Sequence, residues 1–140
     1  MTASASEPDD TAGPGRPTGA PYDLVVVGAG PAGLAGAVAA GEFGLSVALL
    51  DSSTRPGGQF YRHPAPALGA RRPEALHHDW AAFADLRRRL DPSGADHLTG
   101  HHVWSVVQES DGTWTVHALA GTDGSADAPV RIRARALLLA

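Results

Sequence analysis

Three glycines at a fixed spacing, with an aspartate at the end of the next apolar segment, are the residues of this chain most suited to chemistry. The glycines belong to one six-residue segment: Gly28, Ala29, Gly30, Pro31, Ala32 and Gly33. In such a segment the first glycine allows a sharp exit from a strand, the second lets a phosphate approach the backbone, and the third lets a helix pack closely. Asp51 follows about 20 residues later, where a carboxylate can accept hydrogen bonds from two ribose hydroxyls. The spacing predicts a site for the pyrophosphate and adenosine ribose of a dinucleotide.

The segments around these residues have the patterns of a strand, a helix and a second strand. Residues 24–27 are apolar and mostly β-branched, which is typical of a parallel strand buried on both faces. Pro31 suits the first turn of a helix, and we expect this helix to end near Phe43 with Gly44 as its cap. Residues 45–50 predict the second parallel strand. Free N–H groups at the start of such a helix, together with its dipole, attract a pyrophosphate.

Two other interpretations of these residues stay open. The glycines could form a tight turn in another kind of α/β protein, and Asp51 could be a solvated loop residue or a helix cap. A dinucleotide site is favoured because the strand, the helix and the distal acid all meet the context that the motif requires. The negative charge of Asp51 disfavours a 2′-phosphate, so FAD or NAD is expected at this site rather than NADP.

A second group of residues that could bind a dinucleotide follows Asp51. Its members are Arg55, Gly57, Gly58 and Gln59. Two adjacent glycines let the backbone pass close to a long ligand, and an arginine offers charge to phosphate. An ordinary surface turn is the alternative interpretation, because glycine and proline are common in turns. These residues are the ones that distinguish an FAD site from an NAD site.

The segment GGQFYR, together with the motifs above, resembles the two-dinucleotide-domain flavoproteins, the glutathione-reductase-like superfamily of pyridine nucleotide-disulfide oxidoreductase type. Within it, the segment is most similar to the FAD subunits of hydrogen cyanide synthase, opine oxidase and proline dehydrogenase. The resemblance implies that residues 28–33 cradle the FAD pyrophosphate and that Asp51 binds its adenosine ribose. It implies that Arg55, Gly57, Gly58 and Gln59 line the cofactor nearer the flavin. It also implies that the backbone of Val103 touches the adenine ring.

Composition excludes several classes of function. The chain has no cysteine, so it offers no disulfide, no thiolate metal site and no redox cysteine pair. Its seven histidines lack the spacing of metal ligands, and no metal site is expected. The net charge of −4 gives no broad attraction to nucleic acid. No apolar run is long enough to span a membrane and residues 1–20 do not resemble a signal peptide, so a cytoplasmic protein is expected.

The fold class predicted from these patterns is α/β. We expect a Rossmann-like FAD-binding domain with a parallel βαβ sheet and a small antiparallel β-meander, incomplete at its C-terminus. Residues 1–20 are small, polar and rich in proline and glycine, which predicts a disordered tail. Residues 21–140 are expected to form a partial FAD/NAD(P)-binding domain. It contains a helical excursion at about 62–92, helical from Pro73 onward, and the meander at about 102–135. In the meander, residues 113–119 and 130–136 alternate as strands do, and Asp111-Gly112 is a hairpin signal.

The apolar residues 136–140 predict a buried parallel strand. In the family that the chain resembles, a nicotinamide-binding domain follows such a strand, so the chain is expected to be an N-terminal fragment, with NAD(P) bound by the absent domain. A natural short protein completed by a partner is the alternative. The intact protein is expected to oxidise a small-molecule amine or amino-acid derivative by hydride transfer to flavin, with further oxidoreductase subunits as partners. The fragment alone is expected to be inactive, and no catalytic residue is identified. The alternatives are a flavin monooxygenase, a thioredoxin-reductase-like NAD(P)H enzyme and a non-catalytic nucleotide-binding subunit.

Overall fold

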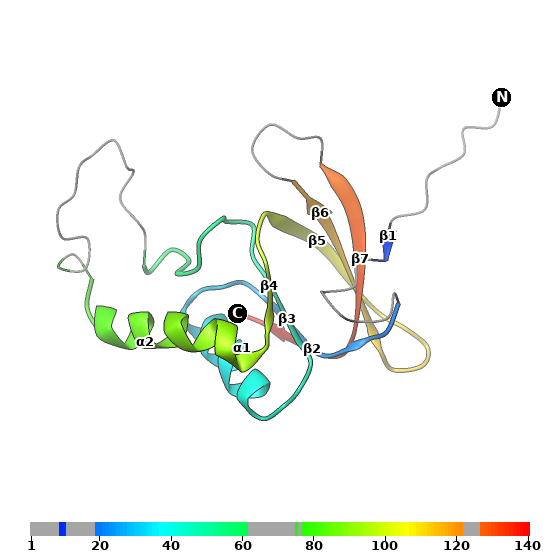
Figure 1. Ribbon diagram of the computed structural model, residues 1–140. Coiled ribbons are helices and arrows are strands. Elements are labelled where there is room, and N and C mark those ends of the chain that lie inside the picture. The colour runs from blue at the N-terminus through cyan, green and yellow to red at the C-terminus, as the bar shows by residue number, and fades with distance from the viewer. Residues whose placement is uncertain (1–8, 11–18, 62–74, 76, 122–126) are drawn as a thin grey trace.

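The computed structural model describes residues 9–10, 19–61, 75, 77–121 and 127–140 (Figure 1). These residues form one mixed sheet of seven strands in the order β4-β3-β2-β7-β6-β5, with β1 beside β7. The elements in chain order are β1 (Asp9–Asp10), β2 (Tyr22–Val27), α1 (Pro31–Glu42), β3 (Val47–Leu50), α2 (Trp80–Leu90), η3 (Asp91–Ser93), β4 (Asp96–Leu98), β5 (His101–Gln108), β6 (Trp114–Ala120) and β7 (Ala128–Leu139).

The predicted strand–helix–strand unit is present as β2, α1 and β3. The two strands pair in parallel, with Val27 opposite Leu50. Helix α1 begins at Pro31 and ends at Glu42, and its C-cap is Phe43, one residue before the predicted cap Gly44, which has a positive φ of 81°. β4 pairs in parallel with β3, and the second half of β7 pairs in parallel with β2. The carboxyl ends of these parallel strands therefore meet at one edge of the sheet, where α/β proteins bind ligands.

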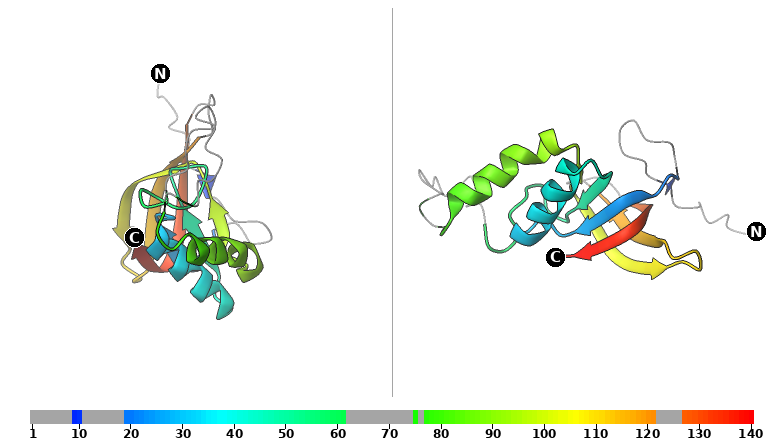
Figure 2. Two further views of the ribbon diagram at one scale, coloured as in Figure 1. Left: turned by 90° about the vertical axis from the view of Figure 1, so that its left-hand side faces the viewer. Right: turned by 90° about the horizontal axis from the view of Figure 1, so that it is seen from below.

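Both helices cover the same face of the parallel strands (Figure 2). The strands contribute Val26, Val47 and Leu49 to the core on this face. From the helices the core receives Leu34, Ala37, Val38, Phe83 and Leu90. Helix α2 is regular from Trp80, while Pro73, where the helical pattern was expected to begin, lies outside the described residues. None of the described helices is long and apolar enough to cross a membrane.

The predicted meander is present as β5, β6 and the first half of β7. β6 pairs antiparallel with both neighbours. The hairpin between β5 and β6 turns where expected, and the N–H of Gly112 donates to the carbonyl oxygen of Glu109 at 2.9 Å. Val116, Ala118 and Ile132 bury one face of the meander against Tyr22 of the parallel part. The meander and the parallel strands thus share one sheet.

Two strands differ from the sequence expectations. β4 was not expected, because a segment of three residues carries no periodic signal. The segments expected as a meander strand at 130–136 and a separate parallel strand at 136–140 form the single strand β7. The strand stays continuous because it pairs with β6 up to Ala134 and with β2 from there to Leu139.

The end of β7 was expected to be buried, and this expectation is wrong. Leu138 is 36% exposed and Leu139 is 64% exposed. The pairing with β6 stops at Ala134, so in the described part of the chain only β2 flanks these last residues. Within the tail expected at 1–20, Asp9–Asp10 pairs with β7 as β1. The remaining expectation for domain boundaries stays a prediction.

Candidate functional site

The turn from β2 into α1 is closed by contacts that only glycine permits. Gly28 has a φ of 102° and donates its N–H to the carbonyl oxygen of Leu50 at 2.8 Å. A side chain at position 28 would collide with the carbonyl oxygen of Ala140. A side chain at position 33 would collide with the carbonyl oxygen of Gly28 itself. The first and third glycines of the motif therefore hold strand and helix together, as the motif predicts.

Gly30 lies in a different environment from its two neighbours in the motif. A Cβ at this position would meet nothing within 4 Å, so the backbone here borders open space. Gly30 is the N-cap of α1 and has no side chain to cap the first helical amides. Pro31 and Ala32, the next two residues, are exposed. Uncapped N–H groups at the start of a helix beside open space suit an anion.

The second glycine segment packs directly onto the first. The N–H of Gly57 donates to the carbonyl oxygen of Ala29 at 2.7 Å. A Cβ on Gly58 would lie 3.0 Å from the Cα of Gly30. The two glycine segments predicted to bind one ligand are therefore neighbours in space.

Tyr61 holds this second segment against the helices, and it is not among the site residues predicted from the sequence. Its N–H donates to the carbonyl oxygen of Gly57 at 3.0 Å. Its ring is 6% exposed and stacks on Phe83 of α2 with 4.3 Å between the ring centroids. Its hydroxyl donates to the carbonyl oxygen of Asp79 at 3.3 Å. The only signal in the sequence was an aromatic residue soon after Gly58, and contact with α2 is not visible there.

Asp51 lies at the carboxyl end of β3 and is 9% exposed. Its N–H donates to the carbonyl oxygen of Leu98 at 3.0 Å, and its carbonyl oxygen accepts from the N–H of His101 at 2.9 Å. Oδ1 accepts from the N–H of Ser53 at 3.2 Å. Oδ2 is buried and has no hydrogen-bond partner among the described residues. A buried carboxylate oxygen without a donor is uncommon, and it leaves Asp51 ready to accept from a ligand hydroxyl.

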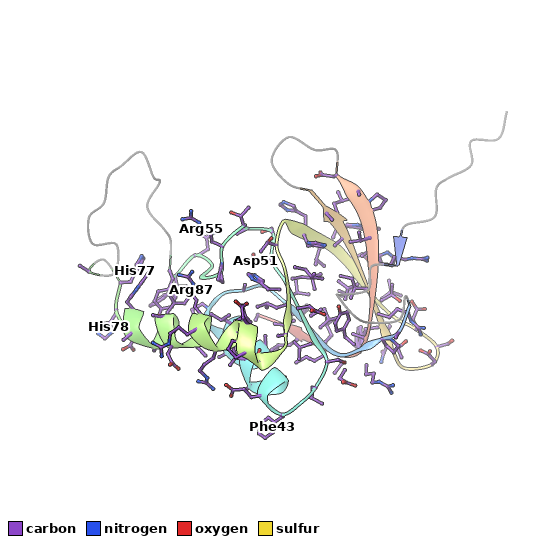
Figure 3. The ribbon with its side chains drawn as sticks, viewed as in Figure 1. Phe43, Asp51, Arg55, His77, His78 and Arg87 are labelled. Carbon is purple, nitrogen blue, oxygen red and sulfur yellow. The ribbon has the colours of Figure 1, made fainter. Side chains whose placement is uncertain are left out.

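Two hollows meet at Asp51. The smaller, of about 240 Å³, is bordered by Gly28, Asp51 and Val103. The larger, of about 400 Å³, is bordered by Asp51, Arg55, Gly58, Gln59 and Tyr61. Figure 3 shows Asp51 and the exposed Arg55 near each other, well away from the turn that carries Phe43. The hollows therefore lie along the edge where the parallel strands end.

The structure gathers the predicted site residues along this edge. Gly28 and Val103 border the smaller hollow, and Gly58 borders the larger one. Gly30 borders the open space at the start of α1, and Gly33 is buried behind it. Gln59, like Arg55, is exposed at the wall of the larger hollow. Which of these residues touch a ligand stays a prediction.

Comparison with known proteins places the chain among flavoproteins. The family described as "FAD dependent oxidoreductase" matches residues 23–117. The chain is 34% identical to a subunit of opine oxidase from Rhizobium meliloti, over 85% of this chain and 22% of that protein. The structure resembles L-proline dehydrogenase from P. horikoshii, with a TM-score of 0.64 and 19% identity over 86% of this chain and 22% of that chain. It also resembles thioredoxin reductase from Streptococcus pyogenes MGAS5005, with a TM-score of 0.54 and 20% identity over 84% of this chain and 34% of that chain.

These matches cover only part of each relative. The chain spans about a fifth of the length of the opine oxidase subunits that it matches. The two structural likenesses lie below a quarter in identity, so they concern the fold. They confirm the predicted Rossmann-like fold class, with the meander as part of it.

Proposed function

Because the chain belongs to the FAD dependent oxidoreductase family, we propose that these residues bind the adenosine diphosphate half of FAD. This is the family that the sequence predicted, and FAD is the cofactor of that family. The proposal also names the groups of this chain that bind the cofactor. The amides at the start of α1 would bind the pyrophosphate, and Asp51 would bind the ribose.

Asp51 is the residue that carries this proposal. Its Oδ2 is buried without a hydrogen-bond donor in the described part of the chain, at the junction of two hollows. A ribose brings vicinal hydroxyls, which are donors that a carboxylate accepts readily. Gly30 supports the same ligand, because open space beside it admits a diphosphate close to the backbone. The residues present therefore fit adenosine diphosphate.

The remaining site residues have roles that follow from their positions. Val103, at the smaller hollow with Gly28, would contact the adenine through its backbone. Gly57, Gly58 and Gln59 would line the path toward the flavin, and the exposed Arg55 would offer charge to a phosphate. When bound, FAD supplies an isoalloxazine ring that accepts a hydride from substrate. In the described part of the chain we assign no residue to a catalytic step.

For the whole protein we propose oxidation of a small-molecule amine or amino-acid derivative. The relative from Rhizobium meliloti is named as part of an opine oxidase, and the structural neighbour from P. horikoshii as a proline dehydrogenase. Partner subunits and NAD(P) binding outside this chain belong to the same proposal. A thioredoxin-reductase-like enzyme or a flavin monooxygenase is the second candidate, because the fold is shared with thioredoxin reductase. The cytoplasmic location expected from the sequence stays a prediction.

Calorimetric titration of the full chain with FAD, ADP, FMN and NAD tests the proposal. FAD and ADP should bind, since both contain the adenosine diphosphate that the site fits. FMN should not bind, because it lacks the adenosine half. FAD and NAD share that half, so the decisive comparison is between their affinities, and FAD should bind more tightly through the segment 55–59. A chain that binds NAD but not FAD would overturn the assignment.

A further inference from the structure

His97 lies in β4, the strand next to the one that carries Asp51. It pairs with Leu49 of β3 in the parallel register. Residues two apart along a strand share a face, so the side chains of Leu49 and Asp51 point to the same side of the sheet. The register therefore puts His97 on that side too. The hydrogen bond from the N–H of Asp51 to the carbonyl oxygen of Leu98 continues the pairing up to the acid itself.

The two side chains share an uncommon feature. Nε2 of His97 and Oδ2 of Asp51 are both buried, and neither has a hydrogen-bond partner among the described residues. Buried polar side-chain atoms nearly always have a partner in folded proteins. These two atoms belong to side chains on one face of adjacent strands, beside the proposed ribose site.

The charge state of His97 depends on the groups around it. Burial lowers its pKa below the ordinary value of 6.5, and the charges of Asp51 and Asp91 oppose this by a smaller amount. These carboxylates act on it from the end of β3 and from η3. The uncharged imidazole is therefore favoured at neutral pH, and acidification adds a positive charge that both carboxylates stabilise. A protonated imidazole donates from both nitrogens and forms its strongest hydrogen bonds to carboxylates.

We propose that His97 is a positioning residue of the adenosine site that acts through Asp51. The inference rests on the proposed function. While the imidazole is neutral, Oδ2 of Asp51 is open to a ribose hydroxyl. Once the imidazole is protonated, it carries a positive charge on which the charge of Asp51 acts, and this cation competes with the ribose for the carboxylate. His97 thus sets the pH range in which Asp51 is available to bind the ribose.

Thermodynamic linkage between ADP binding and protonation fixes the direction in which each changes the other. If protonation of His97 weakens ribose binding, ribose binding must lower the pKa of His97 by the same factor. Affinity for ADP should be constant near neutral pH. It should fall on acidification through the pKa of His97, by at most about tenfold per pH unit for one coupled proton.

The test is calorimetric titration of the full chain with ADP between about pH 7.5 and 5, which brackets an ordinary histidine pKa. Three proteins are compared: the parent chain, His97→Gln, and His117→Gln as a matched control. His117 is a half-buried histidine of β6 that packs against Trp104, with 5.3 Å between ring centroids, away from Asp51. The parent and the control should lose affinity at low pH, and His97→Gln should keep most of it.

A second measurement does not depend on a folded variant. The ring resonances of His97 are titrated by NMR in the parent chain with and without saturating ADP, and the pKa should be lower with ADP. An unchanged His97 pKa, or a His97→Gln profile that matches the parent, overturns this inference while ADP binding at neutral pH leaves the proposed function standing. Absence of ADP binding at every pH overturns the proposed function and the role of His97 with it.

Discussion

The N–H of Gly57 donates to the carbonyl oxygen of Ala29 at 2.7 Å. This hydrogen bond joins the loop after β3 to the loop after β2, and it brings Gly58 against Gly30. The proposed phosphate site is therefore built from two loops that support each other. The two loops serve both folding and binding, and the following substitutions separate the two effects.

Gly30→Ala should impair binding without impairing folding. A Cβ at this position meets nothing within 4 Å, and the φ of −68° suits any residue. The methyl group would occupy the space proposed for phosphate, so ADP affinity should fall by about tenfold or more, equivalent to about 1.4 kcal/mol. Gly33→Ala is the contrast, because its Cβ collides with the carbonyl oxygen of Gly28, and overpacking of this kind costs about 1–3 kcal/mol of stability. Calorimetry and thermal unfolding measure the two effects. Unchanged ADP affinity in a folded Gly30→Ala protein would contradict the phosphate site.

Asp51→Asn should weaken ribose recognition specifically. Hydrogen bonds to a charged group contribute about 1.5–3 kcal/mol each, so ADP affinity should fall by about 10- to 100-fold. The parent chain should prefer ADP to an analogue that lacks both ribose hydroxyls. The Asn variant should show little preference between the two ligands. Titration of both proteins with both ligands checks this, and a preference that survives the substitution would mean that another residue reads the ribose.

Tyr61→Ala should loosen the second glycine segment, because the ring stacks on Phe83 and is 6% exposed. Truncating a buried aromatic residue costs about 3–5 kcal/mol. Tyr61→Phe keeps the ring and loses only the 3.3 Å hydrogen bond to Asp79, so it should cost about 1 kcal/mol. Chemical denaturation measures both. Equal losses in the two variants would show that the hydroxyl rather than the stacked ring holds the segment.

Two glycines of α1 should respond differently to alanine. A Cβ on Gly41 would lie 2.6 Å from the carbonyl oxygen of Ser93, which is backbone in η3 and cannot move freely. A Cβ on Gly36 would lie 2.8 Å from a terminal methyl of Leu138, which can rotate away. Gly41→Ala should therefore destabilise the fold by about 1–3 kcal/mol. Gly36→Ala should change stability little, because about 1 kcal/mol gained in helix propensity offsets the cost of moving the Leu138 methyl group. Thermal unfolding of the pair checks this, and equal stabilities would show that α1 does not pack on η3 as described.

Acid should destabilise the chain through His97. Because burial lowers its pKa in the folded state, the unfolded state binds the proton more readily. Stability from this group is therefore present above the unfolded pKa of 6.5 and decreases as pH falls below it. The melting temperature should decrease from about pH 7 to about pH 5, and less so in His97→Gln. A variant that loses stability with acid as steeply as the parent would assign the effect to other groups.

The sequence by itself determined the local units of this protein. The β-branched run, the glycine spacing and Pro31 predicted β2, the turn and the start of α1, because each depends on neighbours a few residues away. Alternating residues and the Asp111-Gly112 turn predicted the meander for the same reason. Asp51 was identified from its distance to the glycines and its place at the end of the next apolar segment.

Only the tertiary structure decided which distant segments meet. β4 has three residues and no periodic signal, and it exists because β3 offers an edge to pair with. That pairing puts His97 beside the strand of Asp51, and stacking on α2 gives Tyr61 its place at the site. Local sequence patterns indicate the backbone conformation of a segment and which of its faces is buried. Register between strands and packing between elements arise from contacts far apart in the chain, which a single sequence does not display.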